Sequence, residues 1–470
     1  MHTPAPTLGK AGLWVLLCGM LLPQIDFSIV NVALDAMGLS LHITPVQLAL
    51  TVTVYGLCFA IALAPGSLLG DRYGRRKIFM LGIAGFGLAS LACGLASTLT
   101  TLLVARAIQG ITAALIVPQV LATIHVTLSG EHHSRAVGYY SAIGGLSFVI
   151  GQVSGGLLVS ADIAGLGWRS VFLINLPLAV ILLLIVPRCI PETRSEHSHS
   201  VDWAGAMLLA GFVFSLLLPL TVEMPLWQHL LILLLAAICL TLLMIVSRTR
   251  EQRGRMPLLP PSLLRIPTLR LGLLVSILFF ACWSGFMFTL ALTLQGGVGL
   301  SSLQSGNAFI ALGLSYFAGA MLSSRHAGQI PRTRLLLWGC AIQMPGLMLL
   351  MLTLYWGWQH VGIVLLAPAT MLIGFGQSFI VGSIYRICLT NISAAQAGAA
   401  SATVNTVIQI ASGLGAALMG SLFARLLGSD QHYQYAMLGC LLLELILMAL
   451  VAMLVCHYRR GEVRLAAAQA

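Results

Sequence analysis

Long apolar stretches recur along the whole chain, and they constrain its fold more than any other feature. A transmembrane helix needs about 20 mostly apolar residues to cross the hydrocarbon layer. Runs that meet this requirement cover 12–34, 47–69, 78–98, 100–124, 136–159, 171–187, 204–222, 228–247, 271–294, 304–324, 335–355, 361–384, 396–424 and 435–457. Only 8% of residues are charged, which excludes a soluble enzyme, a nucleic-acid-binding protein and a disordered scaffold. The sequence therefore predicts an all-α polytopic membrane protein with fourteen transmembrane helices.

The positions of lysine and arginine predict how these helices are oriented. If both termini are cytoplasmic, 21 of the 24 Lys and Arg residues fall in cytoplasmic segments. Arg169 and Arg425 then lie outside, and Arg106 lies within a helix. This bias follows the positive-inside rule and favours an even number of spans. It also accounts for the net charge of +11 without a nucleic-acid partner. We expect a multi-pass protein of the inner or plasma membrane with both termini cytoplasmic.

The apolar runs are grouped in a 6+2+6 pattern. The predicted domains are an N-terminal six-helix bundle over 1–200, two inserted linker helices over 201–250, and a C-terminal six-helix bundle over 251–470. A basic, proline-rich connector begins the last segment. Two six-helix halves are typical of transporter architectures.

A glycine- and arginine-rich motif follows the second run. Its residues are Gly66, Gly70, Asp71, Arg72, Gly74 and Arg75. Glycines let helices approach closely and let the chain turn tightly, while the acid can bind a helix N-terminus or an arginine. We interpret the motif as a conformational latch, with a simple positive-inside anchor as the alternative. A faint repeat follows the tenth run, where Gly319 and Arg325 recur but Ser324 replaces the acid.

Several segments together resemble the major facilitator superfamily, and in particular its fourteen-helix drug:proton antiporter branch. Besides the latch motif, the resembling segments are 24–34, 103–110, 144–156, 168–177 and 201–205. The resemblance implies a proton-driven exporter of cationic or amphipathic compounds. It also implies a helix-packing role for the glycines of the fifth run: Gly144, Gly151, Gly155 and Gly156. The chain departs from the pattern at Gln152, where a proline is usual, and at Ile408, where an arginine is frequent.

Three charged residues lie at membrane depth, where such residues are costly and suggest function. At 1.5 Å per residue, Asp26 and Arg106 lie about 12 Å and about 9 Å from the outer ends of their helices, in one layer if the helices are neighbours. We expect Asp26 to couple transport to protons and Arg106 to tune it, with a static ion pair as the alternative. Glu444 has no polar neighbour along its own helix. We expect it protonated and either lipid-facing or packed, and a second proton site is the less favoured alternative.

Other polar residues give weaker signals. Candidates for lining a cavity are Asn31, Tyr55, Gln109 and Asn405. Most amides buried in membranes instead bond between helices. The pairs His132–His133 and His197–His199 lack a third ligand nearby, so no metal site is predicted. No Walker loop or hydrolase motif occurs, which argues against ATP-driven transport, a cofactor and an enzyme.

These observations together predict a proton-coupled multidrug efflux antiporter that works by alternating access. Its expected partners are a small-molecule substrate, protons and the lipid bilayer, and we expect it to function as a monomer. Three alternatives stay open. They are a dedicated exporter of one endogenous metabolite or siderophore, a proton symporter, and a non-transporting membrane sensor.

Overall fold

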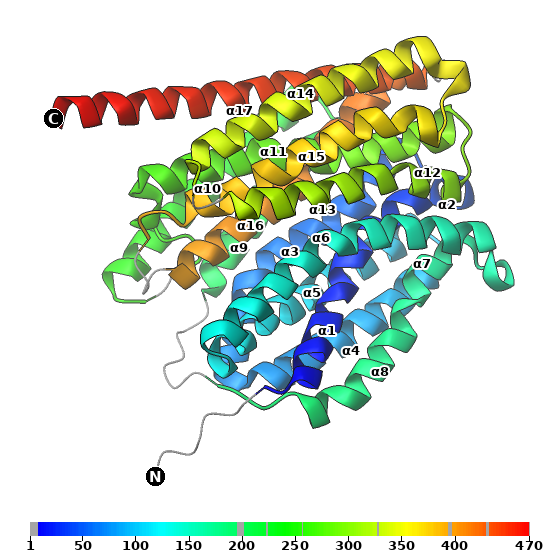
Figure 1. Cartoon of the computed structure of the whole chain (residues 1–470). Coiled ribbons are helices and arrows are strands. Elements are labelled where there is room, and N and C mark those ends of the chain that lie inside the picture. The colour runs from blue at the N-terminus through cyan, green and yellow to red at the C-terminus, as the bar shows by residue number, and fades with distance from the viewer. Residues whose placement is uncertain are drawn as a thin grey trace. The chain divides into compact units, whose positions relative to one another are not determined.

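The computed structural model describes residues 8–194, 202–221, 224–255, 257–326, 329–392, 397–428 and 432–469. Within these ranges the regular structure is entirely helical, and no strand occurs (Figure 1). Helices satisfy their own backbone hydrogen bonds, as a chain in hydrocarbon must. The chain divides into two compact units, Met1–Pro261 and Ser262–Ala470.

The first unit begins with a long broken helix and ends with an antiparallel pair. Its described elements are α1 (Lys10–Ile29), the 3₁₀ turn η1 (Val30–Ala33), α2 (Leu34–Leu41), α3 (Pro45–Tyr73), α4 (Arg75–Gly94), α5 (Leu99–Thr127), α6 (Gly130–Ala161), the 3₁₀ turns η2 (Ile163–Gly165) and η3 (Gly167–Arg169), α7 (Ser170–Leu173), α8 (Asn175–Cys189), α9 (Trp203–Thr221) and α10 (Leu226–Gln252). Helix α3 begins where the sequence specifies it, because Thr44 and Gln47 form a capping box and Pro45 occupies the first turn.

The second unit has the same helical character. Its described elements are the 3₁₀ turn η4 (Leu263–Arg265), α11 (Pro267–Leu292), the π-helical turn η5 (Thr293–Gly297), α12 (Ser302–Ala308), α13 (Ile310–Arg325), α14 (Arg332–Gly357), the 3₁₀ turn η6 (Trp358–His360), α15 (Ile363–Cys388), α16 (Ala397–Leu427) and α17 (Tyr433–Gln469). Helix α11 contacts α15, α16 and α17, and α14 contacts α15 and α17.

Thirteen described helical segments are long and apolar enough to cross a membrane, and each coincides with one predicted apolar run. The all-helical, multi-pass prediction is therefore confirmed for the described residues. The remaining run, 136–159, lies in α6. The described apolar part of that helix is the shorter stretch Ile150–Ala161. The count of fourteen spans and the 6+2+6 pattern stay predictions.

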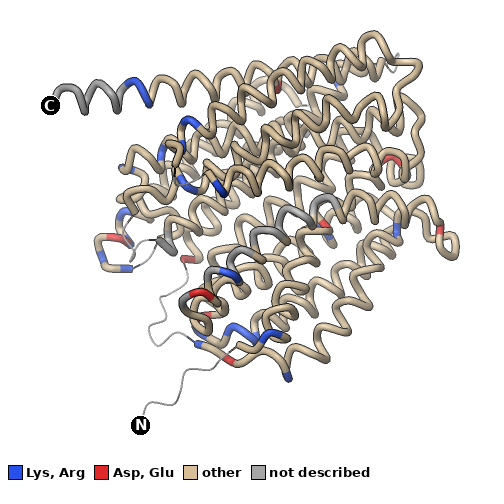
Figure 2. The backbone as a smooth tube through the Cα atoms, viewed as in Figure 1, with Lys and Arg blue, Asp and Glu red and all other residues tan. Residues whose placement is uncertain are grey.

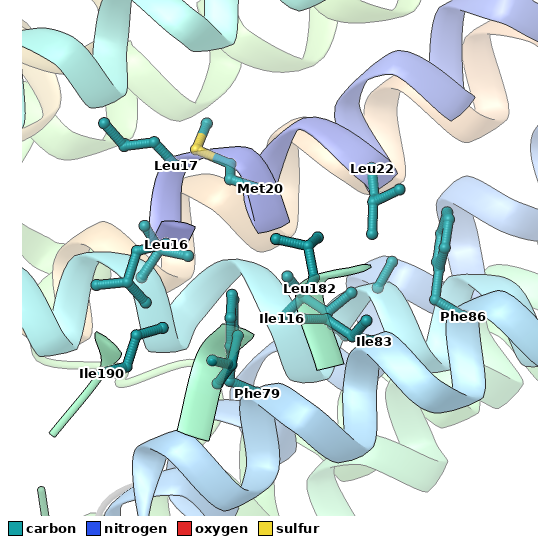
Figure 3. Close-up of a cluster of buried hydrophobic side chains, with 14 of the residues drawn as sticks. Leu16, Leu17, Met20, Leu22, Phe79, Ile83, Phe86, Ile116, Leu182 and Ile190 are labelled. Atoms are coloured by element: carbon teal, nitrogen blue, oxygen red, sulfur yellow. The ribbon is translucent and has the colours of Figure 1, made fainter. Parts of the chain in front are cut away.

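A hydrophobic cluster joins helices α1, α3, α4, α5, α6 and α8 of the first unit (Figure 3). Its labelled members are Leu16, Leu17, Met20 and Leu22 of α1, Phe79, Ile83 and Phe86 of α4, Ile116 of α5, Leu182 of α8, and Ile190. A Cβ atom added to Gly19 would overlap the ring of Phe79, so this glycine lets the ring pack on the α1 backbone. The cluster fixes the helices that also carry the polar site described below.

The glycine motif of α6 lies against α1. A Cβ atom added to Gly151 would lie 2.8 Å from the Ile25 carbonyl oxygen, and one added to Gly155 would lie 2.8 Å from that of Ile29. Gly156 is buried, whereas the surroundings of Gly144 lie outside the described residues. Gln152 is fully buried, and neither polar atom of its amide has a described hydrogen-bond partner.

The inserted pair α9–α10 belongs to the first unit by its contacts. The two helices pack on each other, and α9 also contacts α3. Asp202 fastens the following connector, because its carboxylate accepts hydrogen bonds from Gly205 N (2.9 Å) and Leu258 N (3.1 Å). Within each unit, Lys and Arg gather toward one end of the helices (Figure 2). The side of the membrane on which that end lies, and the predicted division into three domains, stay predictions.

Candidate functional site

A cluster of polar side chains is enclosed among the helices of the first unit. It contains Asp26 of α1, Ser90 of α4, Arg106 and Gln109 of α5, and Asn175 of α8. Each is at most 2% exposed. A group of this polarity is stable in an apolar interior only when its members bond one another.

Three side chains donate hydrogen bonds to the Asp26 carboxylate. Arg106 Nη1 forms an ion pair with Oδ2. Gln109 Nε2 and Asn175 Nδ2 donate to Oδ1 at 2.9 Å and 3.2 Å. The same two amides also donate to Ser90 Oγ, at 2.8 Å and 3.2 Å. The negative charge is thus balanced by one guanidinium and stabilised by two neutral amides.

Further contacts hold Arg106 independently of Asp26. Its Nε donates to the Thr51 carbonyl oxygen (2.9 Å), and its Nη1 donates to Gln109 Oε1 (2.7 Å). The guanidinium carbon lies 4.2 Å from the centroid of the Tyr55 ring, and Tyr55 Oη donates to the Pro23 carbonyl oxygen (2.9 Å). Arg106 Nη2 is buried without a described hydrogen-bond partner. The arginine is therefore oriented by α3 and α5, while one of its donor nitrogens is unused.

The structure brings some of the predicted site residues together and separates others. Asp26 and Arg106 make direct contact. Gln109 forms hydrogen bonds with both of them, and the Tyr55 ring packs on the Arg106 guanidinium. Asn31 is buried in η1. Asn405 belongs to α16 of the second unit, where it accepts a hydrogen bond from Tyr385 Oη at 3.1 Å.

Glu444 is packed between helices of the second unit. It is fully buried, and Gln343 Nε2 of α14 donates to its Oε1 at 3.3 Å. The lipid-facing alternative is therefore wrong, and the residue does have a polar companion. Inspection along α17 alone missed this companion because Gln343 precedes Glu444 by 101 residues.

Arg75 of the latch motif links two segments of the first unit. Arg75 donates to Asp71 Oδ1 from Nη2 (2.6 Å) and Nε (3.1 Å), across the turn between α3 and α4. Its backbone N donates to the Thr193 carbonyl oxygen (3.0 Å), and Arg76 N donates to Glu192 Oε1 (3.1 Å). The turn is therefore tied to the segment that follows α8, and sequence reasoning missed both of these acceptor residues.

The glycines of the latch motif have separate geometric tasks. Gly74 has φ +111°, a backbone conformation that side chains disfavour. The α5 backbone at Ala114 packs on Gly66, and the amide of Gln119 of α5 packs on Gly70 while its Nε2 donates to the Gly66 carbonyl oxygen at 2.8 Å. Arg72 is exposed, with its guanidinium 5.3 Å from the Tyr73 ring. The motif thus packs α3 on α5 and shapes the turn into α4.

No group of three or more His, Cys, Asp or Glu residues suited to a metal ion occurs among the described residues. His133 Nε2 lies 2.6 Å from His125 Nδ1. The predicted pair His197–His199 lies outside the described residues.

The helices and their enclosed ion pair define a polytopic membrane protein with a charged core, which is the arrangement of membrane transporters. Residues 16–416 match the family model described as Major Facilitator Superfamily, and the chain belongs to this family. The predicted family is therefore confirmed. Members of the family are transporters, so the protein is a transporter and not an enzyme.

The chain is similar to several named exporters and solved structures. It is 32% identical over 426 residues to a probable actinorhodin transporter of Streptomyces coelicolor, covering 89% of this chain and 73% of that relative. It is 29% identical over 436 residues to a tetracenomycin C resistance and export protein of Streptomyces glaucescens, covering 91% and 79%. A solved POT family transporter in complex with 5-aminolevulinic acid shares its fold, with TM-score 0.70, 12% identity, and coverage of 96% and 98%.

Proposed function

We propose that this transporter exports small amphipathic or cationic compounds in exchange for protons. The observation that carries the proposal is the enclosed pair of Asp26 and Arg106, in which one carboxylate accepts three hydrogen bonds at the core of the first unit. The export direction is supported by relatives named for tetracenomycin C resistance and export and for drug efflux. Alternating access between two units is the transport mode that fits such an architecture.

In this scheme the Asp26 carboxylate binds a proton and the cationic substrate in turn. A proton on its carboxylate removes the negative charge that balances Arg106, and an uncompensated buried charge is strongly destabilising. The protonated protein therefore favours a different arrangement, in which the guanidinium reaches water or another anion. A cationic substrate competes with the proton for the same carboxylate. This competition makes the release of one a condition for binding the other.

Arg106 is a positioning residue in this scheme. Its bonds to the Thr51 carbonyl oxygen and to Gln109 Oε1 do not involve Asp26, so they orient the guanidinium toward the charged carboxylate before that carboxylate takes up a proton. We propose that the Asp71–Arg75 contact stabilises one conformation of the first unit. Glu444 is a secondary proposal for a proton site, because a neutral amide is its described partner.

The test measures efflux of a panel of lipophilic cationic dyes from membrane vesicles, with and without a proton gradient. We expect Asp26→Asn to abolish gradient-driven efflux at equal expression, because the amide cannot take up and release a proton. Glu131→Gln is the matched control, since the Glu131 side chain is 76% exposed and lies outside the cluster. Gradient-driven efflux that survives Asp26→Asn but not Glu444→Gln would move the coupling site to the second unit.

A dedicated exporter of one metabolite is the second candidate. It is favoured by relatives named for single compounds, actinorhodin and tetracenomycin C. In that case the wild type moves none of the dyes, yet vesicles still take up one aromatic compound in a proton-dependent manner. Transport of that compound by Asp26→Asn and by Glu444→Gln then identifies the coupling carboxylate.

A further inference from the structure

A cavity of about 240 Å³ lies at the C-terminal end of α10, apart from the Asp26 cluster. Its lining residues are Ile245, Val246, Thr249, Arg250, Arg253 and Arg255. Three of these six lining residues are arginines, and none of the described lining residues is acidic. A cavity of this composition attracts an anion with several acceptor oxygens.

The arginines are held in place by the fold of the chain. Gly254 has φ +68° and turns the backbone, so that Arg255 N donates to the Arg250 carbonyl oxygen at 2.9 Å. Arg250 Nε lies 3.5 Å from Asp202 Oδ1, which balances the charge of this one arginine. Arg253 and Arg255 make no ion pair with any acid in the described chain. Two positive charges at the cavity are therefore available to a ligand.

The depth of the cavity matches the headgroup layer of a bilayer. Helix α10 has 27 residues and spans about 40 Å, whereas the hydrocarbon layer is about 30 Å thick. The residues at its end, Arg250 onward, therefore extend beyond the hydrocarbon. Exposed apolar side chains on one face of α10 lead to the cavity: Ile238 (46%), Leu242 (43%) and Ile245 (52%). Their spacing of four and three residues places them in one stripe.

We propose that this cavity binds the phosphate headgroup of an anionic phospholipid, with one acyl chain lying along the apolar stripe. Guanidinium groups pair with phosphate oxygens through two parallel hydrogen bonds, which suits Arg253 and Arg255. A lipid is favoured over free phosphate because the arginines adjoin Ile245 and Val246 and continue into a membrane-facing apolar surface. The site is independent of the proposed antiport and would anchor the α9–α10 pair to the membrane.

The experiment measures retention of phosphatidylglycerol by the purified full-length protein after exchange into detergent, using native mass spectrometry. The test variant is the double substitution Arg253→Gln and Arg255→Gln. The matched control is Arg459→Gln with Arg460→Gln, which removes two arginines of α17 that lie outside the cavity. We expect the wild type and the control to retain the lipid, and the test variant to bind it about tenfold more weakly because two charge-assisted contacts are lost.

Two further arms decide the nature of the ligand. Phosphatidylcholine with the same chains should be retained less than phosphatidylglycerol, and inorganic phosphate at millimolar concentration should not displace the lipid. Displacement by inorganic phosphate would overturn the lipid assignment. Equal loss of lipid from both double variants would overturn the site itself. Thermal unfolding of both variants near the wild-type temperature excludes misfolding as the cause.

Discussion

Glu444 and Gln343 show how an acid is accommodated in the second unit when none of its described partners is basic. Gln343 Nε2 donates to one carboxyl oxygen at 3.3 Å. The other carboxyl oxygen and Gln343 Oε1 are both buried, and neither has a described hydrogen-bond partner. A proton on the Glu444 carboxyl group would turn one of these acceptors into a donor, which would reduce the number of unpaired buried acceptors. The same pair links α14 to α17, so it contributes to packing whether or not it carries a proton in transport.

Substituting each partner separately tests this pairing. We expect Glu444→Gln to change the unfolding free energy by less than about 1 kcal/mol, because its amide can donate to Gln343 Oε1. Gln343→Leu should destabilise by about 1–3 kcal/mol, since it leaves a buried carboxyl unpaired. Thermal unfolding in detergent is the measurement, with the exposed Gln359→Leu as control. Equal effects of the two substitutions at the pair would contradict it.

The charged residues of the site are predictable from sequence, but most of their partners are not. Asp26 and Arg106 stand out because a charge inside an apolar run has few structural explanations. Ser90 and Asn175 give no such signal, since small polar residues are common in membrane helices. The Thr51 acceptor is a backbone carbonyl, which side-chain identity does not reveal. The direct contact of Asp26 and Arg106 likewise depends on helix neighbours that become visible only in the fold.

Two whole helices, α6 and α1, approach each other closely because α6 has glycines at the contact. Gly151 and Gly155 face consecutive turns of α1, where backbone carbonyl groups come within van der Waals distance. In a membrane, helices gain little from burying apolar surface and associate through close packing instead. This contact therefore positions α1, and with it Asp26, through a glycine surface on α6.

An added methyl group tests this contact. We expect Gly155→Ala to destabilise the protein by about 1–3 kcal/mol, because its Cβ would lie 2.5 Å from Val32 Cγ2 and force the helices apart. Gly362→Ala is the control, since no atom lies within 4 Å of its added Cβ and its φ of −151° suits alanine. The apparent melting temperature of each variant in detergent is compared with wild type. Equal melting temperatures of the two variants would argue against the contact.

Helix boundaries show what an apolar pattern can and cannot predict. The run at 12–34 corresponds to a longer broken helix, Lys10–Leu41, because η1 and α2 continue α1 beyond the apolar core. The run at 435–457 is likewise extended, to Gln469 in α17. Apolar content marks the part of a helix that lies in hydrocarbon. Polar residues and caps, which decide where the helix ends, follow different rules.

At the scale of the whole molecule, the number of membrane spans can be even or odd. Thirteen described helical segments are long and apolar enough to span a membrane, and whether α6 also spans it decides whether the number is even. Fourteen spans place both termini on the same side of the membrane, whereas thirteen place them on opposite sides. The positions of Lys and Arg favour the even number.

Reporter fusions settle this parity. We expect green fluorescent protein fused after Ala470 to fluoresce, because it folds in the cytoplasm but not after export. Alkaline phosphatase inserted after Gly165 should be active, since the η2–η3 connection is predicted to face the outside and Gly165 has no atom within 4 Å of an added Cβ. Green fluorescent protein fused before Met1 completes the test, because both reporters above lie after α6. A fluorescent amino-terminal fusion beside a dark carboxyl-terminal one, both at normal expression, would favour thirteen spans.

The packing of Gln119 on Gly70 has a consequence for how this sequence can evolve. A side chain at position 70 would occupy the space of the Gln119 amide. A larger residue at position 70 is therefore acceptable only with a shorter one at position 119, and the Gly66 carbonyl then loses its donor. Homologues that change one position should change the other, although 49 residues separate them along the chain. Evolutionary covariation would thus record a contact between α3 and α5.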